Sequence, residues 1–289
     1  MINSISIIIN CHNGEKFLNR CLDSVLKQTY QNWEIIFWDN CSNDRSKEIF
    51  FKYKDSDSRL NYFCSDKLTN LSVARNFAIS KSQGRYICFL DVDDYWEKNK
   101  LYKQIEFLEK NSAAIVFTNF NIENNINKKK KIFIKKKIDN SNIVDLLLKK
   151  YLVGISTIMF DKTKLKNYFF SNKYHIIGDF DFVMKTSLVD TVAGIDDVLV
   201  NIVQHENNET KKKFKLYVLE LFHWYKNYKK YFKKYNNFEK FRDIVFYESA
   251  KCCLFEKRIK RFIIFFRKLP YILKFKITMF YLFKIVKFN

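Results

Sequence analysis

Glycine and proline are scarce in this sequence: 289 residues contain only five glycines and one proline. So low a content argues against a collagen-like, linker-like or loop-dominated chain. Intrinsic disorder is also excluded, because 47% of the residues are hydrophobic and 18% are aromatic. We therefore expect a globular protein, long enough for one large α/β domain or for a domain with an appendage.

Cysteine motifs and long apolar runs are also missing. None of the seven cysteines stands in a Cys-x-x-Cys pair or has a histidine at zinc-site spacing, which fits a reducing cytosol. The first apolar run, Ile5–Ile9, lacks the basic flank of a signal peptide and is expected to be a β-strand. No stretch reaches the roughly 18 to 20 uncharged apolar residues of a membrane span. A cytoplasmic protein is therefore expected.

Acidic residues are few in the last quarter of the chain. The net charge is +21, and residues 211–289 hold 22 Lys and Arg against 5 Asp and Glu, which gives 22 − 5 = +17. The remainder is close to balanced. This uneven distribution of charge predicts that the two parts of the chain have surfaces with different electrostatic roles. We expect one domain over residues 1–208, with halves of about 1–118 and 119–208, and a basic, aromatic-rich helical region over 209–289.

Strand-like and helical segments alternate along the first domain. Apolar runs rich in β-formers occupy residues 4–9, 33–38, 60–64, 86–90 and 113–117. The stretches between them have helical spacing, with apolar faces at Phe17/Cys21/Leu22/Val25/Leu26 and at Val73/Ala74/Phe77/Ala78, the second helix being stopped by Gly84. This pattern predicts an α/β fold with a mostly parallel sheet covered by helices on both faces.

Later segments are predicted from composition and spacing. Residues 119–140 are rich in Asn and Lys and are expected to be an exposed loop or an edge hairpin. A strand is expected over 153–160, a short helix over 179–188, and strand-like pieces over 190–205.

Polar side chains follow three of the predicted strands. His12 and Asn13 follow the first, Asp39 and Asn40 the second, and the stretch DVDD, residues 91–94, the fourth. In α/β sheets ligands bind at these carboxyl ends. Clustered carboxylates repel one another unless a cation is present, and Mg²⁺ or Mn²⁺ is commonly held by one or two carboxylates and substrate phosphates. A second Asp-x-Asp pair, Asp55 and Asp57, is interpreted as a solvated turn.

The ordered motifs resemble glycosyltransferase family 2, the inverting nucleotide-sugar transferases of GT-A fold. The resemblance rests on SIIINCHNGEKFLNRCLDSVLKQTYQNWEIIFWDNCSND, on LSVARNFAISKSQGRYICFLDVDDYW, and on GDFDFVMKTSL with the later QHENNET. It covers about residues 4–210. It implies a Rossmann-like GT-A domain that transfers a sugar, most simply from a UDP-sugar, to a glycan or a lipid-linked glycan.

The resemblance also implies a metal site. Asp93 would be the main ligand of Mn²⁺ or Mg²⁺, Asp91 would face the ribose and the metal, and His205 would lie near the phosphates or the metal. Asp94 has a purely structural alternative, since an aspartate at this position would also cap the helix expected after it. Val203 stands where relatives commonly have an arginine.

Donor-binding residues follow from the same resemblance. Asp39 would accept a hydrogen bond from uracil, His12 would lie against the base, and Arg75 would reach the base or the diphosphate. Trp96 is expected to line the sugar pocket, with a place in the core as its alternative. Asn40 replaces a usual second acid.

Acceptor activation is assigned to Asp179 by the resemblance. An inverting transfer needs one general base on an element separate from the metal site, and Asp179 stands at the position of the family's catalytic aspartate. Gly178 replaces the acid that usually precedes it. Asp181 would support the site or open a helix.

The basic region suggests a partner. On a helix, Lys276, Lys284 and Lys287 flank an apolar side formed by Phe275, Met279, Leu282 and Val286, as in helices that lie on anionic membranes. A peripheral position on the inner face of the cell membrane is expected, in the synthesis of surface polysaccharide or a related glycoconjugate.

Several other interpretations of the function of this chain remain open. The basic region would also suit a soluble helical subdomain. The +21 charge with interleaved aromatics would suit a single-stranded nucleic-acid binder, although that leaves the acidic cluster unexplained. A sugar nucleotidyltransferase would need a glycine-rich loop where CHNGEKF offers one glycine. Asn40, Gly178 and Val203 admit a non-catalytic relative. No nucleic-acid partner is expected.

Overall fold

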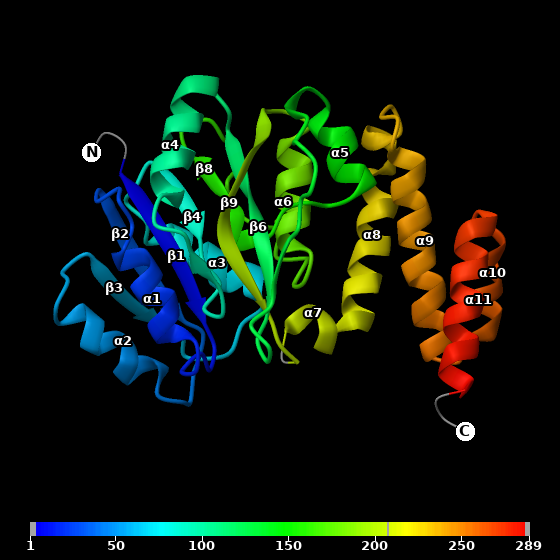
Figure 1. Cartoon of the computed structure of the whole chain (residues 1–289), viewed down its shortest axis with the longest axis horizontal. Helices are drawn as coiled ribbons and strands as arrows, with labels where there is room; N and C mark the ends of the chain where they lie inside the picture. Colours follow the sequence, from blue (N-terminus) through cyan, green and yellow to red (C-terminus); the bar gives the residue numbers. More distant parts are fainter. Residues whose placement is uncertain (1–3, 207, 287–289) are drawn as a thin grey trace. The chain divides into compact units, whose positions relative to one another are not determined.

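A single mixed sheet organises the first two thirds of the chain in the computed structural model, which describes residues 4–206 and 208–286, with side chains up to residue 279 (Figure 1). Its order is β3-β2-β1-β4-β8-β6-β9-β5, with β7 paired to β6. The strands are β1 Ile5–Cys11, β2 Trp33–Asp39, β3 Leu60–Cys64, β4 Tyr86–Phe89, β5 Tyr95–Trp96, β6 Ile115–Asn124, β7 Lys130–Ile132, β8 Met159–Asp161 and β9 Val192–Gln204.

Strands β3, β2, β1 and β4 run parallel, as the alternating pattern predicts. Their near-continuous burial reflects a sheet that is covered on both faces. Strand β8 is antiparallel to both β4 and β6, and β9 runs parallel to β6 with register shifts around Asn119. Residues 190–205 therefore form one long strand where separate pieces were expected.

Helices connect the strands of this sheet. They are α1 Leu18–Leu26, α2 Ser46–Lys54, α3 Leu71–Ser80, α4 Lys100–Asn111 and α6 Gly178–Thr186, with 3-10 turns η1 Asn140–Asn142 and η2 Ile155–Thr157. The predicted inner face of α1 is confirmed, since Cys21, Leu22 and Val25 are fully buried. Residues 119–140 are in part a hairpin of β6 and β7, and residues 153–160 hold η2 and only the start of β8.

Helix α3 is turned differently from the prediction. Ala74 and Ala78 are buried as expected, but Phe77 is 45% exposed and its ring stacks on that of Trp38 with centroids 5.2 Å apart. Arg75 takes a buried position instead, because it pairs with an aspartate described below. The predicted helix stop at Gly84 is also wrong: α3 ends at Ser80, four residues earlier.

Gly84 has a different role, in strand packing. A Cβ atom on Gly84 would lie 2.6 Å from the backbone nitrogen of Ser6 and 2.8 Å from the carbonyl carbon of Ile5. Its amide donates to the Ser6 hydroxyl. A glycine is therefore required where the chain enters β4 beside β1.

The chain divides into two compact units. Unit 1 comprises the residues up to Ile143 and Leu152–Glu206, and unit 2 comprises Val144–Tyr151 and the residues from Asn208 on. The helices of unit 2 are α5 Ile143–Lys149, which begins one residue before the division, α7 Glu209–Lys212, α8 Phe214–Phe232, α9 Phe238–Phe255, α10 Ile259–Arg267 and α11 Tyr271–Val286. The backbone amide of Asn237 donates to Asp145 at 2.6 Å, so α5 is attached to the helices of unit 2.

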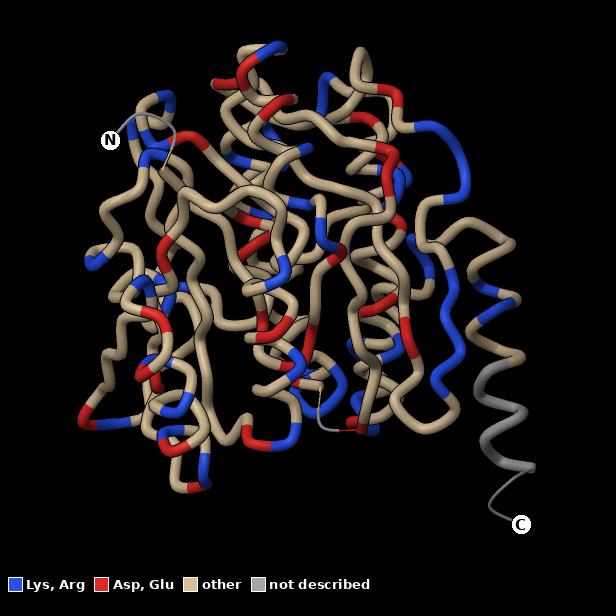
Figure 2. Tube along the Cα trace, turned by 60° about the vertical axis from the view of Figure 1, so that its left-hand side comes forward, with Lys and Arg blue, Asp and Glu red and all other residues tan. Residues whose placement is uncertain are grey.

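Aromatic residues form the core of unit 2. Trp224 and Phe232 are almost fully buried with ring centroids 5.2 Å apart, and Phe241 meets Trp224 edge to face. From Lys257 onward the sequence contains no acidic residue. The helix that leads to the C-terminus carries basic and no acidic residues, whereas both signs alternate around the N-terminal strands (Figure 2).

Among the described residues, no helix is both long enough and apolar enough to span a membrane. The apolar face expected from Phe275 to Val286 lies partly outside the residues whose side chains are described.

Candidate active site

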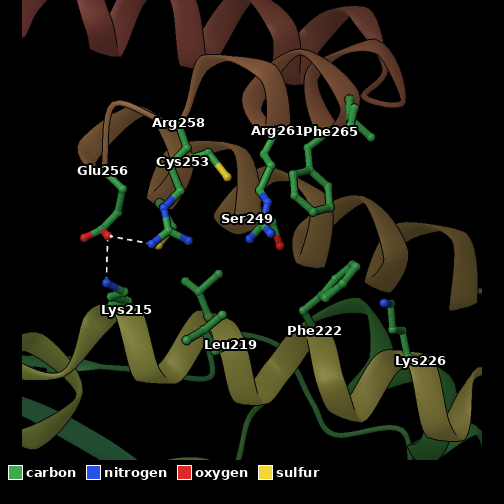
Figure 3. A pocket seen from close by; sticks show the side chains of 13 residues that line it. Lys215, Leu219, Phe222, Lys226, Ser249, Cys253, Glu256, Arg258, Arg261 and Phe265 are labelled. Atoms are coloured by element: carbon green, nitrogen blue, oxygen red, sulfur yellow. Dashed lines mark hydrogen bonds and ion pairs between the residues drawn. The ribbon is translucent and has the colours of Figure 1, made fainter.

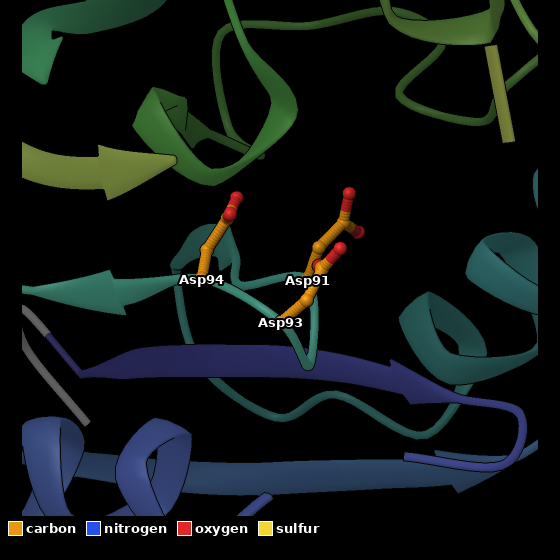
Figure 4. Close-up of side chains that lie close together, drawn as sticks. All are labelled: Asp91, Asp93 and Asp94. Atoms are coloured by element: carbon orange, nitrogen blue, oxygen red, sulfur yellow. The ribbon is translucent and has the colours of Figure 1, made fainter. Parts of the chain in front are cut away.

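Three aspartates gather in the turn after β4, at the carboxyl edge of the parallel strands (Figure 4). One ligand oxygen from each of Asp91, Asp93 and Asp94 lies within 4.8 Å of the others. The turn is tight, because the Asp94 amide donates to the carbonyl of Asp91 at 2.9 Å. We call residues 91–94 the acidic turn.

Asp94 is withdrawn from the open side of the acidic turn. It is 4% exposed, and its two oxygens accept hydrogen bonds from the Ser156 hydroxyl at 2.6 Å and the Val203 amide at 3.0 Å. Burial and the charges of Asp93 and Asp91 raise the pKa of its carboxyl well above the ordinary value. The alternative of a helix cap is wrong, since α4 begins only at Lys100 and Asp94 bonds elsewhere.

Arg75 connects the acidic turn to α6. Its guanidinium is 4% exposed and lies 3.1 Å from Oδ1 of Asp91. The half-buried Asp179, in the first turn of α6, is close enough to feel the charges of both Arg75 and Asp91. Burial raises the pKa of Asp179 to about 6, although the Arg75 charge acts in the opposite direction. The structure thus brings Arg75, Asp91 and Asp179 together.

His205 lies against Asp93. Its Nε2 atom is 2.8 Å from Oδ2 of Asp93, and its ring stacks on Phe17 with centroids 5.0 Å apart. The side chains of Asp93 and His205 are 23% and 14% exposed, so both remain accessible. Carboxylate oxygens suit Mn²⁺ or Mg²⁺, which keep open positions for phosphate oxygens. The carboxylates of Asp91 and Asp93 therefore fit a divalent ion, His205 lies beside Asp93, and the buried Asp94 supports the turn.

A second group of predicted residues lies at the ends of β1 and β2. These strands pair in parallel, and Cys11 is opposite Asp39. Asp39 is 4% exposed and accepts hydrogen bonds from the Ser42 amide and the Tyr62 hydroxyl, both at 2.8 Å. Nδ1 of His12 lies 3.2 Å from the carbonyl oxygen of Asn40. Since β1 lies between β2 and β4, this group and the acidic turn share one edge of the sheet.

The buried side chain of Asn40 connects the segments that follow β2 and β3 by hydrogen bonds. Its side-chain oxygen accepts hydrogen bonds from Ser65 and from both the amide and the hydroxyl of Thr69, and its amide group donates to the Thr69 carbonyl. The asparagine amide can donate as well as accept, which an aspartate cannot. This explains why an amide stands at position 40.

Trp96 lies in the core rather than at a pocket wall. It is 4% exposed within the main apolar cluster, and its indole N–H donates to the Ser156 carbonyl at 3.0 Å. The ammonium group of the buried Lys100 lies 3.7 Å from the centre of the ring. The expectation of a sugar-lining tryptophan is replaced by its alternative, because β5 turns the ring inward.

Gly178 has a steric explanation. A Cβ atom there would meet the Ser72 hydroxyl at 2.6 Å, and that hydroxyl donates to the Tyr174 carbonyl. Asp181, two residues after Asp179 in the first turn of α6, is 1% exposed, and its carboxylate lies 3.4 Å from the ammonium group of Lys185. Asp181 is therefore a buried acid at the start of α6, as one of its two expected roles requires.

Three residues at the site were missed by the sequence reasoning. Ser156 accepts from the Asp91 amide at 3.0 Å and donates to Asp94, and Tyr62 donates to Asp39. An Arg20 guanidinium nitrogen lies 3.2 Å from the Asp93 carbonyl oxygen. These contacts join residues 23 to 73 positions apart, and no local motif marks them.

Comparison with known proteins assigns this arrangement to a family. Residues 6–189 match the model named glycosyl transferase family 2. The chain belongs to that family. A family 2 relative from Escherichia coli, UDP-Glc:alpha-D-GlcNAc-diphosphoundecaprenol beta-1,3-glucosyltransferase WfgD, is 36% identical over 166 residues, which is 57% of this chain and 63% of the relative. The chain thus spans less than two thirds of that relative's length.

Two solved structures share the fold of this chain. Staphylococcus aureus TarS, residues 1–349 in complex with UDP-GlcNAc, superposes with a TM-score of 0.65 at 16% identity and covers 93% of this chain and 82% of that one. A Pyrobaculum calidifontis mannosyltransferase in complex with GDP-Man and Mn²⁺ gives 0.65 at 14% identity, over 86% and 73%. The predicted fold class is confirmed.

Proposed function

We propose that unit 1 is an inverting, metal-assisted glycosyltransferase that moves a sugar from a UDP-sugar to a hydroxyl group of a glycan. One observation carries the proposal. Arg75 pairs with Asp91 in the acidic turn, and its charge also acts on the pKa of Asp179 on α6, so a cation-binding turn and a separate carboxylate lie near the same guanidinium. An inverting transfer requires a general base, which Asp179 would supply, and the acidic turn would hold the ion that assists departure of the diphosphate.

Donor binding is assigned to the carboxyl edge of the sheet. Asp39 would accept a hydrogen bond from the uracil N–H, and the His12 ring would lie against the base. Arg75, a buried cation, would bind the diphosphate. The donors named for related proteins, UDP-Glc for WfgD and UDP-GlcNAc for the TarS complex, support uridine.

The metal is assigned to Asp93 and Asp91 with His205 beside them. A divalent ion bound there neutralises the negative charge that develops on the leaving diphosphate. Ser156 and the Val203 amide fix the turn by holding Asp94, which keeps the other two carboxylates together. Arg20 holds the backbone of the turn at Asp93.

Asp179 is assigned as the general base. Its carboxylate would take the proton from the acceptor hydroxyl as that oxygen attacks the sugar from the face opposite the diphosphate. A pKa of about 6 leaves the group ionised at pH 7 and more basic than an ordinary aspartate. Burial of the Asp179 carboxyl group, at the start of α6, is the cause of this raised pKa.

A lipid-linked acceptor and a position on the cytoplasmic face of the membrane are part of the proposal. The +17 charge of residues 211–289 suits an anionic leaflet. The E. coli relative is named for a diphosphoundecaprenol-linked acceptor. Synthesis of a surface polysaccharide is the setting that these observations support.

The test is a panel of nucleotide sugars screened for hydrolysis with and without Mn²⁺. We expect metal-dependent hydrolysis of a UDP-sugar, lost in Asp93→Asn. Asp55→Asn, at the exposed residue that follows α2, is the matched control and should keep full activity. Metal-independent hydrolysis, or equal loss in both variants, would contradict the proposal. Salt-sensitive binding of single-stranded RNA that Asp93→Asn leaves intact would favour a nucleic-acid binder.

A further inference from the structure

Helices α8, α9 and α10 of unit 2 enclose a cavity of about 360 Å³ (Figure 3). Its lining is apolar at the bottom, where Val218 is 4% exposed and Cys252 and Cys253 are 8% exposed. Phe222 and Phe265 meet edge to face at 5.3 Å at one end. The volume is in the range of small-molecule sites, roughly 300 to 1,000 Å³.

The rim of this cavity is basic. Four cations and one acid line it, which gives 4 − 1 = +3; they are Lys215, Lys226, Arg258, Arg261 and Glu256. Glu256 is already bound to Lys215 at 2.7 Å and to Arg258 at 3.6 Å. Those two cations are therefore partly neutralised at one end of the cavity.

Arg261 differs from its neighbours on the rim. Figure 3 shows its side chain extending from α10 toward Ser249 inside the cavity. Within the described part of the chain, Arg261 forms no ion pair or hydrogen bond. A guanidinium in this position suits a phosphate or a carboxylate, either of which accepts two parallel hydrogen bonds.

A ligand that fills this cavity must combine an anionic head with a hydrocarbon chain, because the cations lie at the rim and the apolar side chains lie below them. We propose that the cavity binds a single anionic lipid, with its phosphate against Arg261 and Lys226 and its chain along Leu219, Phe222 and Phe265.

The surface of α10 and of α11, the next helix along the chain, supports a membrane as the source of the lipid. Ile259 on α10 is 56% exposed, and Tyr271, Ile272 and Phe275 on α11 are 88%, 71% and 67% exposed. Water-exposed apolar side chains among lysines are typical of segments that contact a bilayer. The inference rests on the proposed membrane association, but it adds a discrete site for one molecule.

The experiment uses decyl phosphate below its critical micelle concentration, with calorimetry on the full chain. We expect one site per chain, with decyl maltoside and inorganic phosphate each binding at least tenfold more weakly. Arg261→Ala should weaken decyl phosphate at least tenfold. Arg267→Ala is the matched control, because Arg267 is exposed on α10 and does not line the cavity. Leu219→Asn, at a 52% exposed position, should also weaken binding without unfolding the protein.

Several outcomes would overturn the inference. Equal losses in Arg261→Ala and Arg267→Ala would indicate diffuse electrostatic adsorption. Equal binding of decyl maltoside would indicate an apolar cavity alone, equal binding of inorganic phosphate an anion site alone, and no binding would remove the site. Hydrolysis of UDP-sugar by the unmodified protein is measured separately, so a failure here is distinct from a failure of the proposed transferase.

Discussion

Nε2 of His205 lies 2.8 Å from Oδ2 of Asp93, although 112 residues separate them in the chain. Strand β9 ends one residue before His205, and the acidic turn follows β4. The sheet therefore places the imidazole of His205, which follows β9, next to the carboxylates that follow β4. Phe17 holds the ring in place by stacking.

His205→Ala is expected to weaken Mn²⁺ binding by about 10- to 100-fold, the usual effect of losing a ligand or a group that orients one. Titration of Mn²⁺ in the presence of UDP measures this. His223→Ala, in an exposed histidine of α8, should leave Mn²⁺ affinity unchanged. Unaltered Mn²⁺ affinity in His205→Ala would exclude His205 from the metal site.

Asp39→Asn is expected to lower UDP affinity about 10- to 150-fold, because the loss of a hydrogen bond to a charged acceptor costs roughly 1.5 to 3 kcal/mol. Binding of Mn²⁺ alone should stay the same, since Asp39 lies in the group at the ends of β1 and β2. Tyr62→Phe, which removes one donor to Asp39, should have a smaller effect on UDP. A calorimetric titration compares the three proteins. Equal UDP affinity in all of them would rule out base recognition by Asp39.

Asp179→Asn is expected to reduce transfer at least a thousandfold while UDP and Mn²⁺ bind normally. The asparagine amide keeps the shape of the side chain, but it does not remove the proton from the hydroxyl group of the acceptor glycan. The matched control is Asp190→Asn, which lies beyond the end of α6. Steady-state kinetics with the donor identified by the screen separate kcat from KM. Wild-type turnover in Asp179→Asn would remove the residue from its proposed role.

The raised pKa of Asp179 also predicts how stability depends on pH. The folded pKa of about 6 exceeds the ordinary 3.8, so the folded state holds the proton more tightly, and stability falls as pH rises from about 4 to about 6. The loss is at most about 3 kcal/mol, since each pKa unit is worth about 1.4 kcal/mol, and less where solvent screens the group.

Asp179→Asn removes this carboxylate, so it should raise the melting temperature at pH 8 and leave it nearly unchanged at pH 4. Transfer by the unmodified protein should fall as pH drops below about 6. Thermal melts at both values check the first statement. An equal shift at pH 4 and pH 8 would show that ionisation of Asp179 is not responsible.

Gly84→Ala is expected to destabilise unit 1 by about 1 to 3 kcal/mol, because the new methyl group would overlap the backbone of β1. Urea unfolding followed by circular dichroism measures the change. Gln83→Ala, at the neighbouring exposed position, should have little effect. Equal stability of the two variants would show that β1 and β4 have room to separate.

The local sequence determined which segments are helices and strands, and it placed polar groups at the carboxyl ends of the parallel strands. The apolar runs specify strands, and a polar residue that follows a parallel strand comes to the carboxyl edge wherever that strand lies in the sheet. Asp39 and the acidic turn were therefore predictable from the sequence alone. The inner face of α1 was also predictable, because its apolar spacing is unbroken.

Tertiary structure decided which of these groups stay open to a ligand. Asp94 is withdrawn by Ser156 and Val203, Trp96 is turned into the core by β5, and α3 rotates so that Arg75 is buried against Asp91. Each outcome depends on contacts between segments far apart in the chain. Burial and electrostatic pairing are properties of packing, so a single segment does not encode them.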